Sequence, residues 1–90
     1  MTELTQHEKD TIVAVLGSYD KETISQYTAG NSKYVPAISD SLEMSDMELE
    51  VEERLGWDTV CFTAWDNLKI GATIEEIFAT ATTIKASVKT

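Results

Sequence analysis

A single serine stands out as a residue whose position could support chemistry. Ser41 follows Asp40, a good helix N-cap, so we expect Ser41 to be the first residue of a helix. Free backbone N–H groups and the helix dipole favour a negative group there, so a phosphate ester on the Ser41 hydroxyl would be well placed. The plain alternative is that Ser41 is only a polar residue at a helix start.

Other kinds of chemistry find little support in the residue types and their spacing. His7 is the only histidine and lies in a polar N-terminal turn, so nothing indicates a Ser-His arrangement with Ser41. Asp40, Glu43 and Asp46 do not form a calcium loop, because no glycine turn divides them. The chain also has no glycine-rich loop that would bind phosphates. We therefore predict no catalytic residue and no metal site.

The segment that follows Ser41 is strongly acidic. Between Asp40 and Leu55 it has seven acids and a single base, Arg54. Like charges four residues apart, such as Asp46 and Glu50, destabilise an isolated helix by a few tenths of a kcal/mol per pair, on the order of 0.3. A sequence selected only for stability would include lysines, so the acids are expected to have a further role.

Two leucines stand among these acids. Leu42 and Leu49 are seven residues apart, so they share a helix face, and that face lies roughly opposite the apolar stripe of Met47 and Val51. The surrounding acids are Asp46, Glu52 and Glu53. Apolar anchors ringed by charge indicate a docking surface, although a merely solvated face is the plain alternative.

Composition and charge limit the class of protein. The 90 residues suffice for one domain, residues 1–90, and 42% of them are hydrophobic, which is typical of a globular chain. The net charge of −9 predicts repulsion from nucleic acid and anionic membranes and attraction to basic partners, unless the acidity serves only solubility. Cys61 is the only cysteine, which excludes an internal disulfide. We expect a cytoplasmic monomer, since the polar start resembles no signal peptide and no apolar run would span a bilayer.

Helix signals occur in four segments, and no segment is convincing as a strand. Capping-box pairs, in which a hydroxyl and a carboxylate cap the same helix start, predict helices after Thr5 (with Glu8) and after Thr73 (with Glu76). The first helix should end near Gly17, and the fourth should fray over residues 85–90. The core stripes are Ile12, Val15 and Leu16 in the first helix, and Ile74, Ile77, Phe78, Ala81 and Ile84 in the fourth.

The acidic helix begins after Asp40, with Glu43 at the acid position of a capping box, and ends at Gly56. Its core stripe is Met44, Met47, Val51 and Leu55. A short third helix is predicted from Thr63 to Leu68, and Trp57 and Trp65 are expected to anchor the nearby loops. Residues 18–39 are predicted to be mainly loop, held by Ile24, Tyr27 and either Tyr34 or Val35. The fold class is therefore all-α: a four-helix bundle of three longer helices and one short, with a long loop between the first two.

Asp40-Ser41-Leu42 at the head of an acidic helix resembles the signature of the acyl carrier protein family, and the resemblance continues without a gap through Leu55. The segments "AVLGSYDKETI" and "ATIEEIF" resemble the family more loosely. The resemblance implies a non-catalytic carrier with 4′-phosphopantetheine on Ser41, whose terminal thiol holds acyl groups as thioesters. It also implies that Asp40 assists the attachment.

The resemblance further implies which residues meet the partner enzymes. The partners would be a phosphopantetheinyl transferase and acyl-processing enzymes, such as acyl- and ketosynthases, of a fatty-acid or polyketide pathway. The implied contact residues are Leu42, Glu43, Asp46, Leu49, Glu52 and Glu53. A longer loop before Asp40, without the glycine common there, favours a dedicated carrier of one pathway. An unmodified acidic adaptor and a peptidyl or aminoacyl carrier are the alternatives.

Overall fold

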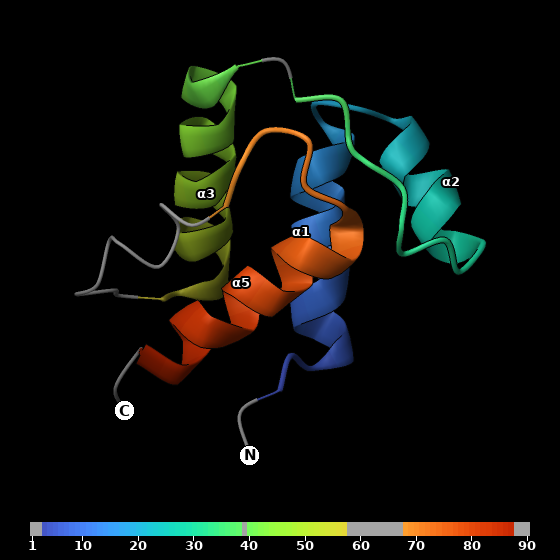
Figure 1. Ribbon diagram of the computed structural model, residues 1–90. Coiled ribbons are helices and arrows are strands. Elements are labelled where there is room, and N and C mark those ends of the chain that lie inside the picture. The colour runs from blue at the N-terminus through green and yellow to red at the C-terminus, as the bar shows by residue number, and fades with distance from the viewer. Residues whose placement is uncertain (1–2, 39, 58–67, 88–90) are drawn as a thin grey trace.

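The protein is a bundle of helices in the computed structural model, which describes residues 3–38, 40–57 and 68–87 (Figure 1). These residues contain α1 (Gln6–Gly17), α2 (Glu22–Thr28), α3 (Ser41–Leu55) and α5 (Ile74–Ser87), and they contain no strand. Helix α1 packs against both α2 and α3, and α5 crosses the α1–α3 pair obliquely. The predicted all-α class is confirmed.

Two helices start at the predicted capping boxes. At the start of α1, Thr5 N donates to Glu8 Oε1 at 2.8 Å and Glu8 N donates to Thr5 Oγ1 at 3.2 Å. At the start of α5, Thr73 N donates to Glu76 Oε1 at 2.8 Å and Glu76 N donates to Thr73 Oγ1 at 3.1 Å. Each box satisfies two backbone donors that the helix itself leaves unpaired.

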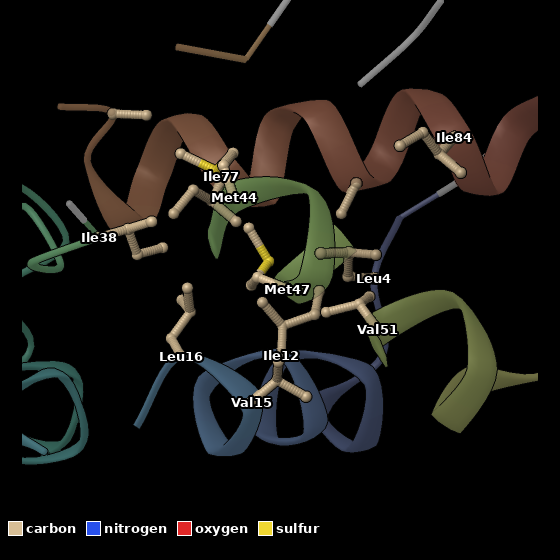
Figure 2. Close-up of a cluster of buried hydrophobic side chains, with 12 residues drawn as sticks. Leu4, Ile12, Val15, Leu16, Ile38, Met44, Met47, Val51, Ile77 and Ile84 are labelled. Carbon is tan, nitrogen blue, oxygen red and sulfur yellow. The ribbon is translucent and has the colours of Figure 1, made fainter. Parts of the chain in front are cut away.

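The core lies where α1, α3 and α5 meet, as Figure 2 shows. The predicted stripes supply most of it, and Leu55 and Phe78 pack half-buried at its edge. Leu4, Ile38 and Ala72 complete the core from outside the predicted stripes. Burial of each large side chain stabilises the fold by about 1.5–3 kcal/mol. The labelled members of this cluster are Leu4, Ile12, Val15, Leu16, Ile38, Met44, Met47, Val51, Ile77 and Ile84.

The prediction of a loop over residues 18–39 was wrong in one part, because Glu22–Thr28 forms α2. This helix has no side-chain hydrogen bond from its N-cap residue, so the local signal was weak. Two contacts hold it. The first is local: Asp20 Oδ1 accepts a hydrogen bond from Glu22 N, two residues further on, at 3.1 Å. The second is tertiary: the Tyr27 ring meets the Phe78 ring edge-on at 5.8 Å. The expected inward packing of Tyr27 is therefore confirmed.

The other residues expected to anchor this loop differ in how far they are buried. The side chain of Ile24 lies against Gly17, where an added Cβ would approach its Cδ1 to 2.5 Å, but Ile24 is still 47% exposed. Tyr34 is half-buried and tied down by hydrogen bonds, whereas Val35 is exposed. Of the two alternatives, Tyr34 is therefore the residue that holds the loop.

The predicted fraying of the C-terminal segment was also wrong as far as Ser87, where α5 ends. Lys85 Nζ donates to Glu8 Oε1 and to the backbone oxygen of Glu3, both at 2.7 Å. These bonds link the last turn of α5 to the start of α1, a contact between segments 77 residues apart that local sequence patterns do not reveal.

Part of the third predicted segment lies outside the described residues. Trp65 is among those positions, and of the predicted helix only Leu68 is described, in a non-helical conformation. Cys61 also lies outside the described residues. Trp57 packs half-buried against the core, as expected for a loop anchor. None of the described helices has the length and apolar character needed to traverse a bilayer.

Candidate functional site

The chain that leads to Ser41 is fastened to the end of α1 through Asp20. Tyr34 Oη and Ala37 N both donate to Asp20 Oδ2, the latter at 2.9 Å. The Tyr34 hydrogen bond, together with that from Ala37 N, lowers the pKa of Asp20 and keeps its carboxylate charged. Asp20 therefore caps α2 and fixes the segment just before α3 with one side chain.

The same connection is also tied to the start of α5. Ile74 N donates to the backbone oxygen of Tyr34 at 3.0 Å, and Glu75 N donates to that of Ser32 at 2.9 Å. An exposed ion pair, Lys33 Nζ to Glu75 Oε2 at 3.0 Å, adds to these contacts. Backbone oxygens of the connection thus satisfy free N–H groups at the α5 N-terminus. Hydrogen bonds to the end of α1 and to the start of α5 therefore hold the segment that leads to Ser41.

Asp40 is the N-cap of α3, as predicted. Its backbone is extended (φ −152°, ψ 174°), and its Oδ1 accepts a hydrogen bond from Glu43 N at 2.9 Å. Ser41 is the first residue of the helix and is exposed. Within residues 3–38, 40–57 and 68–87, its side chain makes no hydrogen bond. The Ser41 hydroxyl is therefore available for modification, while Asp40 provides the cap.

The opposite end of α3 is closed by Gly56, which adopts a left-handed conformation with φ 69°. Trp57 N donates to the backbone oxygen of Glu52 at 2.9 Å, so the last turn is capped in the way that suits a glycine. An exposed ion pair between Arg54 and Glu50, at 2.7 Å, also spans this turn. Helix α3 is thus capped at both ends as the sequence predicts.

The two leucines stand in solvent, as the periodicity predicted. Leu42 is 76% exposed and Leu49 is 62% exposed. At 100° per residue, Asp46 and Glu53 lie within about 60° of both leucines, and both acids are exposed. We call these four residues the outer ridge of α3; it lies opposite the buried Met47 and Val51.

The structure does not place the other two predicted contact acids on this ridge. Glu43 and Glu52 are half-buried and lie on opposite flanks of α3, about 180° apart around the helix axis. The six predicted partner-binding residues are therefore spread over the exposed half of the helix and do not form a single line along it. Leu42 and Asp46 lie in its first half, nearest Ser41.

One flank of α3 faces Tyr19, which the sequence reasoning did not single out. Tyr19 packs half-buried against the core at the end of α1. Burial raises the pKa of its phenol, and the nearby carboxylates of Asp46, Glu50 and Glu43 raise it further. Three carboxylates of α3 therefore lie near the Tyr19 phenol on this flank.

The other flank borders a hollow beside Ser41. Its volume is about 360 Å³. Helix α3 forms one side and the loop before α5 forms the other, and the lining residues are Ser41, Met44, Ser45, Glu48, Leu68, Lys69 and Ile70. Met44 and Met47 are both buried in the core, as their periodicity indicated, and Met44 also lines this hollow. Sequence patterns do not reveal the hollow, because its walls come from separate segments.

The geometry at Ser41 fits a covalently attached arm. The hydroxyl is exposed, it forms no hydrogen bond within the described residues, and open space adjoins it. Among these same residues, no group of three or more His, Cys, Asp or Glu side chains could hold a metal ion.

No protein-family model matches this chain, and no curated protein or solved structure is significantly similar to it.

Proposed function

We propose that this protein is an acyl carrier protein. In this proposal Ser41 carries 4′-phosphopantetheine, and acyl intermediates pass between the enzymes of a fatty-acid, polyketide or related specialised pathway. The observation that carries the proposal is an exposed serine hydroxyl directly after the N-cap Asp40, at the head of an acidic helix with two exposed leucines. The arm would supply a terminal thiol that holds acyl groups as thioesters.

The residues around Ser41 have distinct roles in this proposal. Asp40 fixes the start of α3 through its bond to Glu43 N, so the Ser41 hydroxyl is held at the first turn of a preformed helix. Its carboxylate would also assist the transferase that moves phosphopantetheine from coenzyme A to the Ser41 oxygen, with adenosine 3′,5′-bisphosphate as the leaving group. Asp20 and Tyr34 support this position by fastening the chain that precedes it.

The outer ridge of α3 suits short-lived docking. Leu42 and Leu49 offer apolar contacts, and Asp46 and Glu53 attract basic residues of a partner. Exposed ion pairs contribute about 0.2–1 kcal/mol each and are screened by salt, so a complex built from them dissociates readily. Tethering cargo to such a carrier raises its effective concentration at each successive enzyme.

Attachment can be tested by co-expression with a broad-specificity phosphopantetheinyl transferase, followed by intact mass measurement. The expected result is a mass increase of one phosphopantetheine, lost in Ser41→Ala. Ser45→Ala is the matched control, because Ser45 is exposed and lines the same hollow one turn further along. An unshifted wild-type mass, or a shift that survives Ser41→Ala, would contradict the proposal.

The docking surface can be tested by reversing the ridge charges with Asp46→Lys and Glu53→Lys. Binding to a basic partner enzyme, such as the transferase, should weaken and lose much of its salt dependence. The control, Asp10→Lys with Glu22→Lys, makes the same change in net charge at exposed positions of α1 and α2. Equal loss of affinity in both double variants would show that only the net charge matters.

A second candidate function is a non-modified acidic adaptor. The exposed leucines of the outer ridge favour it, because their use as anchors does not depend on Ser41. Retained partner binding by a protein that the transferase never modifies would support the adaptor over the carrier.

A further inference from the structure

Lys69 is a basic residue beside the hollow at Ser41 in this acidic chain. It lies in the loop before α5, is exposed, and lines the same hollow as Ser41. Glu48, from α3, also lines this hollow. A phosphate on Ser41 would add negative charge to a chain whose net charge is already −9. A cation at this position would offset that repulsion.

The described part of the chain contains six bases, and three of them are committed to ion pairs. These pairs are Lys33 with Glu75, Arg54 with Glu50 and Lys85 with Glu8. Lys9, Lys21 and Lys69 form no ion pair with any described residue. Of these three, Lys69 alone lines the hollow beside Ser41.

We infer that Lys69 is the cationic partner of the phosphate group attached to Ser41, and that the pair holds the first part of the arm in the hollow. The inference rests on the proposed function. A lysine ammonium on its flexible four-carbon stem suits a single phosphate as a point charge. Leu68 and Ile70, on either side of Lys69, provide apolar wall along which the following atoms of the arm would lie.

The amine reactivity of individual lysines tests this inference, measured with an amine-acylating reagent and peptide mass spectrometry on the full chain. Three forms are compared: unmodified protein, transferase-loaded protein, and protein with phosphoserine incorporated at position 41. Lys69 should react about two- to fivefold more slowly in both phosphorylated forms, as expected for an exposed ion pair worth up to about 1 kcal/mol. Lys9 and Lys21 are internal controls whose rates should not change.

The phosphoserine form separates failure of this inference from failure of the proposed function. If the transferase does not load the protein but phosphoserine slows Lys69, the carrier proposal fails and the phosphate–lysine pairing stands. If loading occurs and Lys69 reacts at an unchanged rate in the loaded form, the inference is overturned and the carrier proposal stands. Equal slowing of Lys9, Lys21 and Lys69 would also overturn it, because it would reflect only the added charge.

A variant provides a second readout that does not use lysine reactivity. The phosphorus NMR signal of the loaded protein should change its chemical shift in Lys69→Gln. The matched change Lys21→Gln, at another unpaired lysine within the described residues, should leave the signal in place. Identical phosphorus shifts in the wild type and Lys69→Gln would show that the amine does not contact the phosphate.

Discussion

Asp40 and Ser41 are neighbours with different roles, and substitutions at the two positions should separate them. Asp40→Ala removes the 2.9 Å hydrogen bond from Glu43 N to the cap carboxylate. Loss of such an N-cap lowers the free energy of unfolding by about 1 kcal/mol, which for a domain of this size lowers Tm by about 4–8 °C. Ser41→Ala removes an exposed hydroxyl without a hydrogen bond among the described residues. Because alanine favours helices more than serine does, the stability should stay equal or rise by about 0.5 kcal/mol or less.

The measurement is urea unfolding followed by circular dichroism at neutral pH, paired with the rate of phosphopantetheine loading. Asp40→Asn is the matched control, because asparagine caps a helix about as well as aspartate. Its stability should therefore resemble that of the wild type, while its loading slows if the carboxylate itself assists attachment. Ser41→Ala should remain folded and take no arm.

Two results would refute this reasoning. If Ser41→Ala lowered the free energy of unfolding by more than about 1 kcal/mol, the serine would be a structural residue. Surface substitutions outside caps and buried networks usually change that free energy by less than about 0.5 kcal/mol. Unchanged stability in Asp40→Ala would mean that the cap seen at the start of α3 does not stabilise the helix.

Three further predictions concern the supports of the site. Thr23 is fully buried and its hydroxyl has no hydrogen-bond partner among the described residues, so Thr23→Val should raise the free energy of unfolding by about 1 kcal/mol, whereas Thr23→Ser should lower it. Burial raises the pKa of Glu8, but the hydrogen bonds from Lys85 and Thr5 and the charge of Lys85 outweigh this effect and hold the pKa below its usual value of 4.5. Lys85→Met should therefore lower the free energy of unfolding by about 1–2 kcal/mol at neutral pH, and this loss should fade in acid as the pH falls below that usual value and Glu8 becomes protonated. The hydrogen bond to Asp20 raises the pKa of Tyr34 from 10.0 to about 12. In urea unfolding, the wild type should therefore be more stable than Tyr34→Phe at neutral pH. This difference should shrink above pH 10, as the unfolded tyrosine ionises, and also in acid, as Asp20 is protonated. A Tyr34→Phe difference that is constant across pH would contradict the last of these.

The parts of the fold that local patterns determine were predictable from the sequence. The Thr5–Glu8 and Thr73–Glu76 boxes, and the Asp40 cap, each depend on residues within four positions of one another, and α1, α3 and α5 begin where these signals lie. The exposure of Leu42 and the burial of the opposite face followed from the helical period alone.

The features that sequence reasoning missed depend on contacts between distant segments. Helix α2 is held by the packing of Tyr27 on Phe78 of α5. Its local signals are weak, because its N-cap residue makes no side-chain hydrogen bond and only Asp20, one residue earlier, accepts from Glu22 N. The hollow beside Ser41 exists only because the loop that carries Lys69 lies against α3. The periodicity within each segment does not show that the two segments lie side by side. Ser41 could therefore be predicted from the sequence, but the hollow beside it could not.

The central claim, that Ser41 carries phosphopantetheine in the cell, is tested most directly by mass spectrometry of the protein purified from its own cells. The account predicts that the peptide containing Ser41 has the mass of one phosphopantetheine added, with part of the population extended further by an acyl group on the thiol. An unmodified Ser41 peptide, from cells in which another carrier is found loaded, would contradict it.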